Sequence, residues 1–203
     1  MNVLKPLLSI CILASITFAC KNDTKESVKV EEDIVKTAPE KVKKVKKELT
    51  VAEKEQLNSV MSKLMVTDET KNFASALVSS GLTDMLSKKK GPYTVFAPSN
   101  IAFDSIANEK KREILDPKNK ETLSNLLKNH IVEGQVDSSA LLQKSKGSSN
   151  SFKTLGGSAL IIKKQGSDLV IIDANGAKAV LGKSDINGSN GVVHVIDKVL
   201  SLD

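Results

Sequence analysis

The last fifty residues contain short runs that favour β-strands, separated by glycine-rich turns. Runs of a few residues between such turn signals are typical of strands joined as hairpins. The pair Asn175-Gly176 lies between two of the runs and predicts a hairpin with a two-residue turn. The predicted strands are Phe152–Leu155, Leu160–Lys164, Leu169–Asp173, Ala177–Leu181 and Val192–Ile196. We therefore expect an antiparallel sheet in the C-terminal part of the chain.

The residues before this sheet favour helices. Thr50 and Glu53 have the spacing of a capping box, and Gly81 follows a helical pattern as a stop signal. The predicted elements are a helix through Leu57–Met65, a helix over Asp68–Ser80, a strand over Tyr93–Ala97, a helix capped by Ser99 or Asn100, and a helix over Leu123–Leu127. Helices early in the chain and hairpins late predict an α+β domain over residues 50–203.

The first nineteen residues have the features of an export signal. Lys5 gives a positive start, and residues 7–18 form an uncharged, mostly apolar run. A helix of that length spans about 18 Å, which is too short for a hydrocarbon core of about 30 Å. Cys20 follows the small Ala19, and the segment resembles a bacterial lipoprotein signal. This resemblance implies a signal peptide over residues 1–19 and a lipid on Cys20.

A plain secretory signal and an uncleaved anchor are the alternatives. Cys11 would leave with the signal, so Cys20 would be the only cysteine of the mature chain, at the position where acylation needs it. Each buried CH₂ contributes about 0.8 kcal/mol, so several acyl chains would hold the protein durably on a membrane. Lys21 in place of Asp after the cysteine resembles lipoproteins sent to an outer membrane.

Residues 20–49 predict a lipidated N-terminus and a charged, flexible tether. The stretch 21–56 holds ten Lys and nine acidic residues, without aromatic residues or glycine. Such segments bury too little apolar surface to offset chain entropy. Lys41–Lys47 could instead contact anionic lipid or nucleic acid, but the acidic residues 31–33 nearby favour simple solvation. The net charge of +6 is divided between tether and domain and does not single out nucleic acid.

Three blocks in register resemble a fasciclin-like domain. They are YTVFAPSNIAF (Tyr93–Phe103), LLKNHIVEG (Leu126–Gly134) and NGVVHVIDKVL (Asn190–Leu200). The resemblance covers residues 60–202 and implies an antiparallel β-sheet core or sandwich wrapped by several short helices. It also implies an extracellular or surface-attached interaction module that is not an enzyme. Apolar residues on both faces of the final block predict a central, buried strand.

The central block suggests candidate contact residues. In animal members this block carries a Tyr-His pair associated with integrin binding, whereas here the pair is Asn129-His130. Without the aromatic residue, integrin-like recognition is not expected. Asn129, His130 and Ile131 are the candidate partner-binding residues, and the alternative for His130 is a hydrogen-bonded structural role. For His194, on an apolar strand, we expect a structural role.

Motifs of catalysis and cofactor binding are missing from the sequence. Gly188-Ser189-Asn190-Gly191 lacks the spacing of a nucleophile elbow. The stretch GAKAVLGKS (176–184) resembles a phosphate-binding loop only superficially, because five residues separate its glycines where the loop needs four. Two histidines and no mature-domain cysteine give no metal motif. We predict no enzyme activity, no cofactor, no metal site and no nucleic-acid partner.

These features together predict a lipoprotein anchored through Cys20 in a bacterial cell envelope. Its fasciclin-like domain would face the outside, from an outer membrane or the cell surface, or face the periplasm. The expected function is binding of an unknown protein or polysaccharide in adhesion, matrix or biofilm association. The alternative is a non-adhesive envelope scaffold or a carrier of an apolar ligand. A hydrolase acting on envelope polymers is the third hypothesis.

Overall fold

The centre of the domain is a pair of strands far apart in the sequence, β1 (Tyr93–Pro98) and β8 (Gly191–Ile196). The computed structural model describes residues 48–202, so the predicted signal peptide, Cys20 and nearly all of the predicted tether lie outside the described residues. β1 and β8 run parallel, in register from Tyr93↔Gly191 to Pro98↔Ile196. Every residue of both strands is buried.

Two short strands complete this first sheet. β2 (Ile131–Glu133) and β7 (Ile186–Gly188) pair antiparallel with β1 and β8, giving the order β2-β1-β8-β7. The prediction that the final strand is central and buried is confirmed. The β1–β8 pair departs from the antiparallel expectation. No short turn joins these two strands, so hairpin geometry does not fix their relative direction.

The second sheet is antiparallel throughout. Its order is β3 (Ser151–Lys153), β4 (Ala159–Gln165), β5 (Asp168–Ile172) and β6 (Lys178–Val180). Isolated bridges Val132↔Thr154 and Leu181↔Ile196 connect it to the first sheet. The sequence located these strands to within a few residues, but it did not predict β2 or β7.

The hairpin between β5 and β6 is confirmed, but its turn differs from the prediction. Asp173 N–H donates to the Ala177 carbonyl at 3.0 Å, which leaves three residues in the loop rather than two. The Asp173 carboxylate accepts from Asn175 N–H at 3.0 Å and from Ala177 N–H at 2.8 Å. Gly176 supplies the positive φ of 85° that closes the loop. The aspartate before Asn175-Gly176 thus selects the longer turn.

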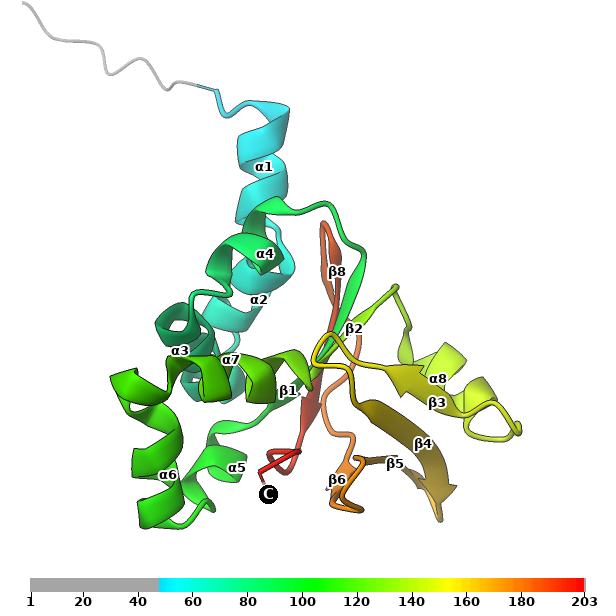
Figure 1. Cartoon of the computed structure of the whole chain (residues 1–203). Coiled ribbons are helices and arrows are strands. Elements are labelled where there is room, and N and C mark those ends of the chain that lie inside the picture. Colours follow the sequence, from blue (N-terminus) through cyan, green and yellow to red (C-terminus); the bar gives the residue numbers. More distant parts are fainter. Residues whose placement is uncertain (1–47, 203) are drawn as a thin grey trace, which may run out of the picture. The chain divides into compact units, whose positions relative to one another are not determined.

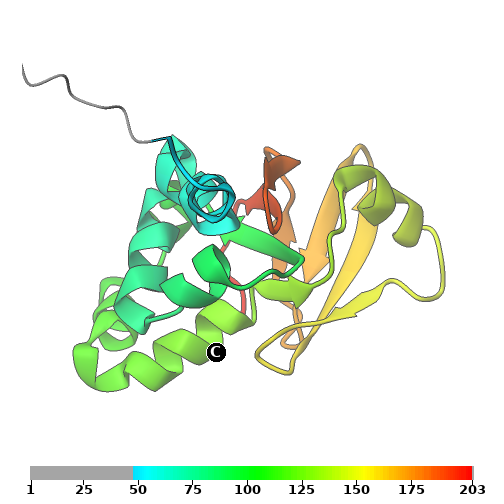
Figure 2. The ribbon, with the colours of Figure 1, turned by 90° about the horizontal axis from the view of Figure 1, so that it is seen from above.

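The first sheet separates two hydrophobic cores. Most of the helices lie on one side of it, and the second sheet lies on the other together with the helix Ser138–Lys144 (Figures 1 and 2). Alternation along β1 sends Val95 into the helical core and Phe96 into the core between the sheets. The helices are α1 (Val51–Leu57), α2 (Val60–Val66), α3 (Lys71–Ser80), α4 (Thr83–Lys88), α5 (Asn100–Asp104), α6 (Asn108–Leu115), α7 (Lys120–Lys128) and α8 (Ser138–Lys144), with 3-10 turns at Asp68–Thr70 and Pro117–Asn119.

The predicted capping signals are confirmed, and one predicted helix is divided. Thr50 and Glu53 form the expected capping box at the start of α1. The pattern through Leu57–Met65 breaks at Ser59, whose hydroxyl accepts from Ser62 N–H at 3.3 Å and starts α2. As a result α1 has no buried residue, and Leu57 lies exposed.

Two further helix boundaries follow the prediction. Gly81 ends α3 with a left-handed φ of 82°. Ser99, rather than Asn100, caps α5, because its hydroxyl accepts from Ala102 N–H at 3.1 Å. Over residues 48–202, the helices lack the length and apolar character that crossing a membrane requires.

Candidate functional site

The predicted contact residue His130 lies inside the helical core. Its side chain has 0% exposure, and its ring lies 5.7 Å from the ring of Phe73. Leu200 N–H donates to Nε2 at 3.0 Å, so Nδ1 carries the proton and donates to the Leu126 carbonyl at 2.9 Å. Burial lowers the pKa of His130 from 6.5 to about 4, because the charged ring would lose its hydration. His130 is therefore a neutral structural residue at pH 7.

The neighbours of His130 divide between core and surface. Ile131 also has 0% exposure and belongs to the helical core. Asn129 is half-buried, and its side-chain oxygen accepts from the Thr154 hydroxyl at 3.1 Å. The prediction that His130 and Ile131 contact a partner is thus corrected: in the folded domain their side chains are covered. Of the three candidates, Asn129 alone retains a partly exposed side chain.

His194, Asp185 and Ser138 come together, but not as a catalytic triad. Ser138 hydrogen-bonds to the Asp185 carboxylate instead of to the histidine. Asp185 N–H donates to His194 Nδ1 at 3.3 Å, and Nε2–H donates to the Val136 carbonyl at 2.8 Å. Because both ring nitrogens are occupied, His194 has no lone pair for a serine proton. Burial also lowers the pKa of His194, and the expected structural role is confirmed.

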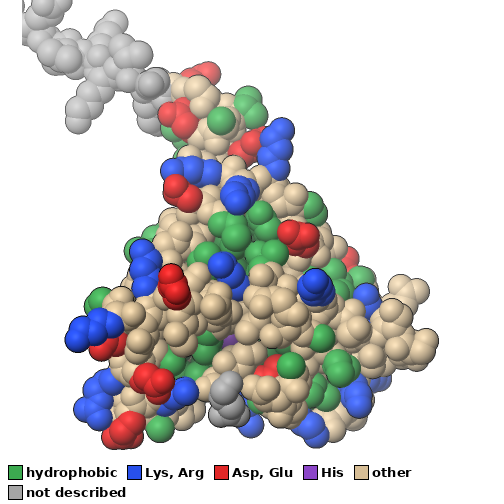
Figure 3. Space-filling view, in the orientation of Figure 1, with side chains coloured by type: hydrophobic (Ala, Val, Ile, Leu, Met, Phe, Trp, Pro, Cys, Tyr) green, Lys and Arg blue, Asp and Glu red, His purple; other side chains and the backbone are tan. Residues whose placement is uncertain are grey.

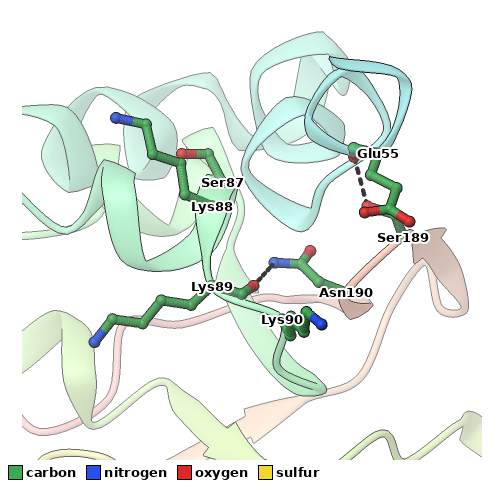
Figure 4. Close-up of a pocket in the computed structure, with 7 residues that line it drawn as sticks. All are labelled: Glu55, Ser87, Lys88, Lys89, Lys90, Ser189 and Asn190. Atoms are coloured by element: carbon green, nitrogen blue, oxygen red, sulfur yellow. Dashed lines mark hydrogen bonds between the residues drawn. The ribbon is translucent and has the colours of Figure 1, made fainter. Parts of the chain in front are cut away.

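A polar pocket opens where helices α1 and α4 meet the turn between β7 and β8 (Figure 4). Its volume is about 330 Å³. The side chains that surround it come from α1, from the end of α4 with the two residues after it, and from the turn. They are Glu55, Ser87, Lys88, Lys89, Lys90, Ser189 and Asn190. We refer to this site as the Lys88–Lys90 pocket.

The Asn190 side chain connects the backbone segments at the base of the Lys88–Lys90 pocket through hydrogen bonds. Its amide nitrogen donates to the carbonyls of Leu86 at 3.0 Å and Lys89 at 2.9 Å, and the second of these bonds is visible in Figure 4. Its side-chain oxygen accepts from Val60 N–H at 2.8 Å. One side chain of only 7% exposure therefore joins α2, α4 and the start of β8.

The turn next to Asn190 is fixed to α1. Ser189 Oγ donates to the Glu55 carbonyl at 2.6 Å, and Ser189 N–H donates to the Asn58 carbonyl at 2.8 Å. Opposite this turn, Gly91 has a φ of 70°, and a Cβ there would lie 2.4 Å from the Asn190 carbonyl oxygen. A side chain cannot replace this glycine without moving the backbone. The pocket therefore has a rigid frame.

Of the charged side chains that line the pocket, one forms an ion pair and the others do not. Lys88 forms an ion pair with Asp84 at 2.9 Å. Within residues 48–202, neither Lys89 nor Lys90 has an ion-pair partner, and the Glu55 carboxylate has none either. In Figure 3, basic and acidic side chains are interspersed over the helices, whereas basic side chains also predominate at the lower right, over the second sheet. Lys163 and Lys178 of that sheet likewise have no ion-pair partner among the described residues.

No motif in the sequence singles out Lys88–Lys90. The signal that could have drawn attention to it is Asn190, the first residue of the third block. The two segments lie about a hundred positions apart, so their contact becomes visible only in the fold. Among the described residues, no group of three or more His, Cys, Asp or Glu side chains is arranged to hold a metal ion.

Comparison with known proteins identifies the class of this domain. The Fasciclin domain family matches residues 68–202, and the chain belongs to this family. A solved FAS1 domain pair from the insect cell adhesion molecule Fasciclin I has the same fold, with a TM-score of 0.63 at 19% identity. That match covers 70% of this chain and 50% of the insect chain.

Two curated relatives show how far the similarity extends. The transforming growth factor-beta-induced protein ig-h3 of Sus scrofa is 34% identical over 147 residues, which are 72% of this chain and 20% of the pig protein. Protein sll1483 of Synechocystis is 32% identical over 126 residues, which are 62% of this chain and 63% of that protein. The chain thus spans a fifth of the first relative and less than two thirds of the second.

Proposed function

We propose that this protein is an envelope lipoprotein whose fasciclin domain binds a protein or glycan in adhesion, matrix or biofilm association. The observation that carries the proposal is the order of the sequence: a predicted export signal over residues 1–19, then Cys20 and a charged segment, and then a fasciclin domain. A membrane anchor followed by a tether presents a binding domain away from the cell. The similarity to a domain pair from a cell adhesion molecule supports the same role.

The proposal places the domain outside the cytoplasm, on the cell surface or an outer membrane, and gives it no catalytic role. Both ring nitrogens of His194, which lies near Ser138 and Asp185, are already hydrogen-bonded, and this supports a binding domain over a hydrolase. The buried contacts of His130 argue against recognition through the central block itself. Binding therefore has to use other parts of the surface.

The anchor is tested by replacing Cys20 with Ala and fractionating the cells. We expect the wild-type chain in the membrane fraction and the variant in the soluble fraction. Cys11→Ala is the matched control, because it changes a cysteine that would leave with the signal. Retention of the Cys20→Ala chain in the membrane would refute the lipid anchor.

The adhesive role is tested in cells with and without the gene. We expect loss of the gene to reduce surface attachment or aggregation, and expression of the wild-type chain to restore it. Unchanged behaviour on varied surfaces would refute the adhesive role. A native mass spectrum that shows co-purified lipid on the domain would instead favour the carrier function.

A further inference from the structure

We infer that the Lys88–Lys90 pocket binds a carboxylate-bearing sugar residue, a uronic acid, of an acidic polysaccharide. This inference rests on the proposed binding function and names the chemistry of its partner. It depends on three properties of the pocket: unpaired cations, hydrogen-bonding groups of both kinds, and a fixed frame.

The unpaired cations attract an anionic group. Lys89 and Lys90 are consecutive and exposed, and their ammonium groups form no ion pair with a described residue. Lys88 is held by Asp84, so Lys89 and Lys90 are the unpaired cations of the run, and in Figure 4 the Lys89 side chain extends away from Glu55 and Ser189. Ammonium groups bind carboxylates through charge-assisted hydrogen bonds. Because the lysines are exposed, the attraction should weaken as salt is added.

The remaining side chains offer hydrogen-bonding partners that a sugar can use and a simple anion cannot. Glu55 places a carboxylate at the wall that α1 contributes, where it would repel any anion beside it, a uronate included, but can accept hydrogen bonds from sugar hydroxyls. Ser189 donates its hydroxyl proton to the Glu55 carbonyl, so its oxygen remains an acceptor. Ser87 adds a hydroxyl group that can donate or accept. One acid surrounded by several hydroxyls is the pattern of a uronic acid.

The frame lets this site bind without first becoming ordered. Asn190 fixes the backbone of Leu86, Lys89 and Val60, and it uses its whole amide to do so. The backbone entropy is therefore lost on folding rather than on binding. The cavity of about 330 Å³ is large enough for a sugar residue and is partly open to solvent.

The shape of this region favours a polymer over a planar membrane. α1 projects beyond α4 and the start of β8 (Figure 1), and Glu55 belongs to α1 itself. A flat headgroup layer would meet α1 before it reached the recess behind this helix. A flexible chain of sugar residues can enter from the side. No aromatic residue lines the pocket, so a single sugar residue should bind weakly and many copies on a cell would add their contributions.

The test uses the full chain, purified in a neutral detergent, and trigalacturonate as the probe. Binding is measured by saturation-transfer NMR, with the methyl ester of the same trisaccharide as the uncharged control. We expect trigalacturonate to bind at least about tenfold more tightly than its ester. The variant Lys89→Glu/Lys90→Glu should weaken trigalacturonate binding by about tenfold or more.

A matched charge change separates the pocket from general electrostatics. Lys163→Glu/Lys178→Glu makes the same change at two exposed positions on the second sheet and should alter binding by less than about twofold. Equal weakening in both double variants would overturn the inference. So would equal binding of acid and ester, or displacement of the trisaccharide by inorganic phosphate at equal concentration.

Two further outcomes bear on the alternatives. If the chain without its lipid binds vesicles of phosphatidylglycerol and phosphatidylcholine through Lys89 and Lys90 but does not bind trigalacturonate, the pocket contacts a membrane and the inference is wrong. Cell attachment is measured separately with the same variants. Attachment that persists with Lys89→Glu/Lys90→Glu refutes the pocket as the adhesive site, whereas attachment that is unaffected by loss of the gene refutes the proposed function alone.

Discussion

The surroundings of His130 and the Lys88–Lys90 pocket contain similar hydrogen bonds, but the first region is buried and the second leaves charged side chains exposed. In both regions a side chain bonds to the backbone of distant segments, His130 to Leu126 and Leu200, and Asn190 to Val60, Leu86 and Lys89. Both ring nitrogens of His130 bond to backbone groups inside the helical core, and the side chain has no exposure to solvent. Around Asn190 the same kind of bonding leaves two lysines facing solvent. The comparison shows that a conspicuous histidine can be structural, while the exposed and unpaired lysines of a plain surface run stay available for binding.

The largest expected effect is the loss of the His130 side chain. His130→Ala removes the acceptor of the buried Leu200 N–H and opens a cavity beside Phe73. We expect the free energy of unfolding to fall by about 3 to 4 kcal/mol, measured by chemical denaturation. The control Asn129→Ala removes one hydrogen bond of a half-buried residue and should cost about 1 kcal/mol. Equal losses would contradict the structural difference between these neighbours.

The burial of His130 should also make the stability of the domain depend on pH. The pKa of His130 is about 4 in the folded domain against its ordinary value of 6.5, so the unfolded chain binds this proton first as the pH falls. The stability that the neutral His130 ring gives to the folded domain is fully present above pH 6.5. As the pH falls from 6.5 to 4 this stability is lost, and the free energy of unfolding decreases by about 3 kcal/mol. His194, whose pKa burial also lowers, acts in the same direction.

This pH dependence is measured from denaturation midpoints across that range. His130→Gln keeps a polar side chain that cannot titrate, and it should flatten the part of the profile that His130 contributes. A profile just as steep in His130→Gln as in the wild type would show that other groups cause it.

Asn190→Ala should have a smaller effect on stability. The change leaves Val60 N–H, Leu86 O and Lys89 O without their side-chain partner, and we expect a loss of about 2 to 3 kcal/mol in the free energy of unfolding. Asn190→Asp is the sharper variant. It keeps an acceptor for Val60 N–H but places a carboxylate oxygen against two carbonyl oxygens. At neutral pH it should therefore destabilise the domain at least as much as the alanine does.

The smallest stability effect is expected for Lys89→Glu/Lys90→Glu. Both side chains are exposed and unpaired among the described residues, so the free energy of unfolding should change by no more than about 0.5 kcal/mol. Thermal unfolding of the double variant checks this. A large loss would mean that the lysines stabilise the fold, and that the pocket differs less from the surroundings of His130 than we describe.

Features that depend on residues close together in the sequence were predicted, whereas features that depend on distant residues were not. Thr50 with Glu53, Gly81 and the β5–β6 hairpin depend on neighbours a few positions away, and all three were predicted. The family blocks added the overall fold. The division at Ser59 was missed, because apolar residues continue at helical spacing on both sides of it.

Long-range pairings could not be predicted from local signals. The parallel alignment of β1 with β8 and the contact of Asn190 with Lys89 join residues separated by most of the domain. β7 is only three residues long and includes a glycine, so it carries little strand signal. The burial of His130 likewise depends on Leu200, which no pattern within the central block reveals.

The position of α1 has a mechanical consequence. The chain enters the described domain through this helix, and Glu55 of the same helix lines the Lys88–Lys90 pocket. A polymer held in the pocket and an anchor pulling on the N-terminal segment would therefore apply force at neighbouring points. The tension would run through α1 and the bonds of Ser189 and Asn190, and it would bypass the pairing of β1 with β8. A cell under shear could then pull on its attachment without unfolding the centre of the domain.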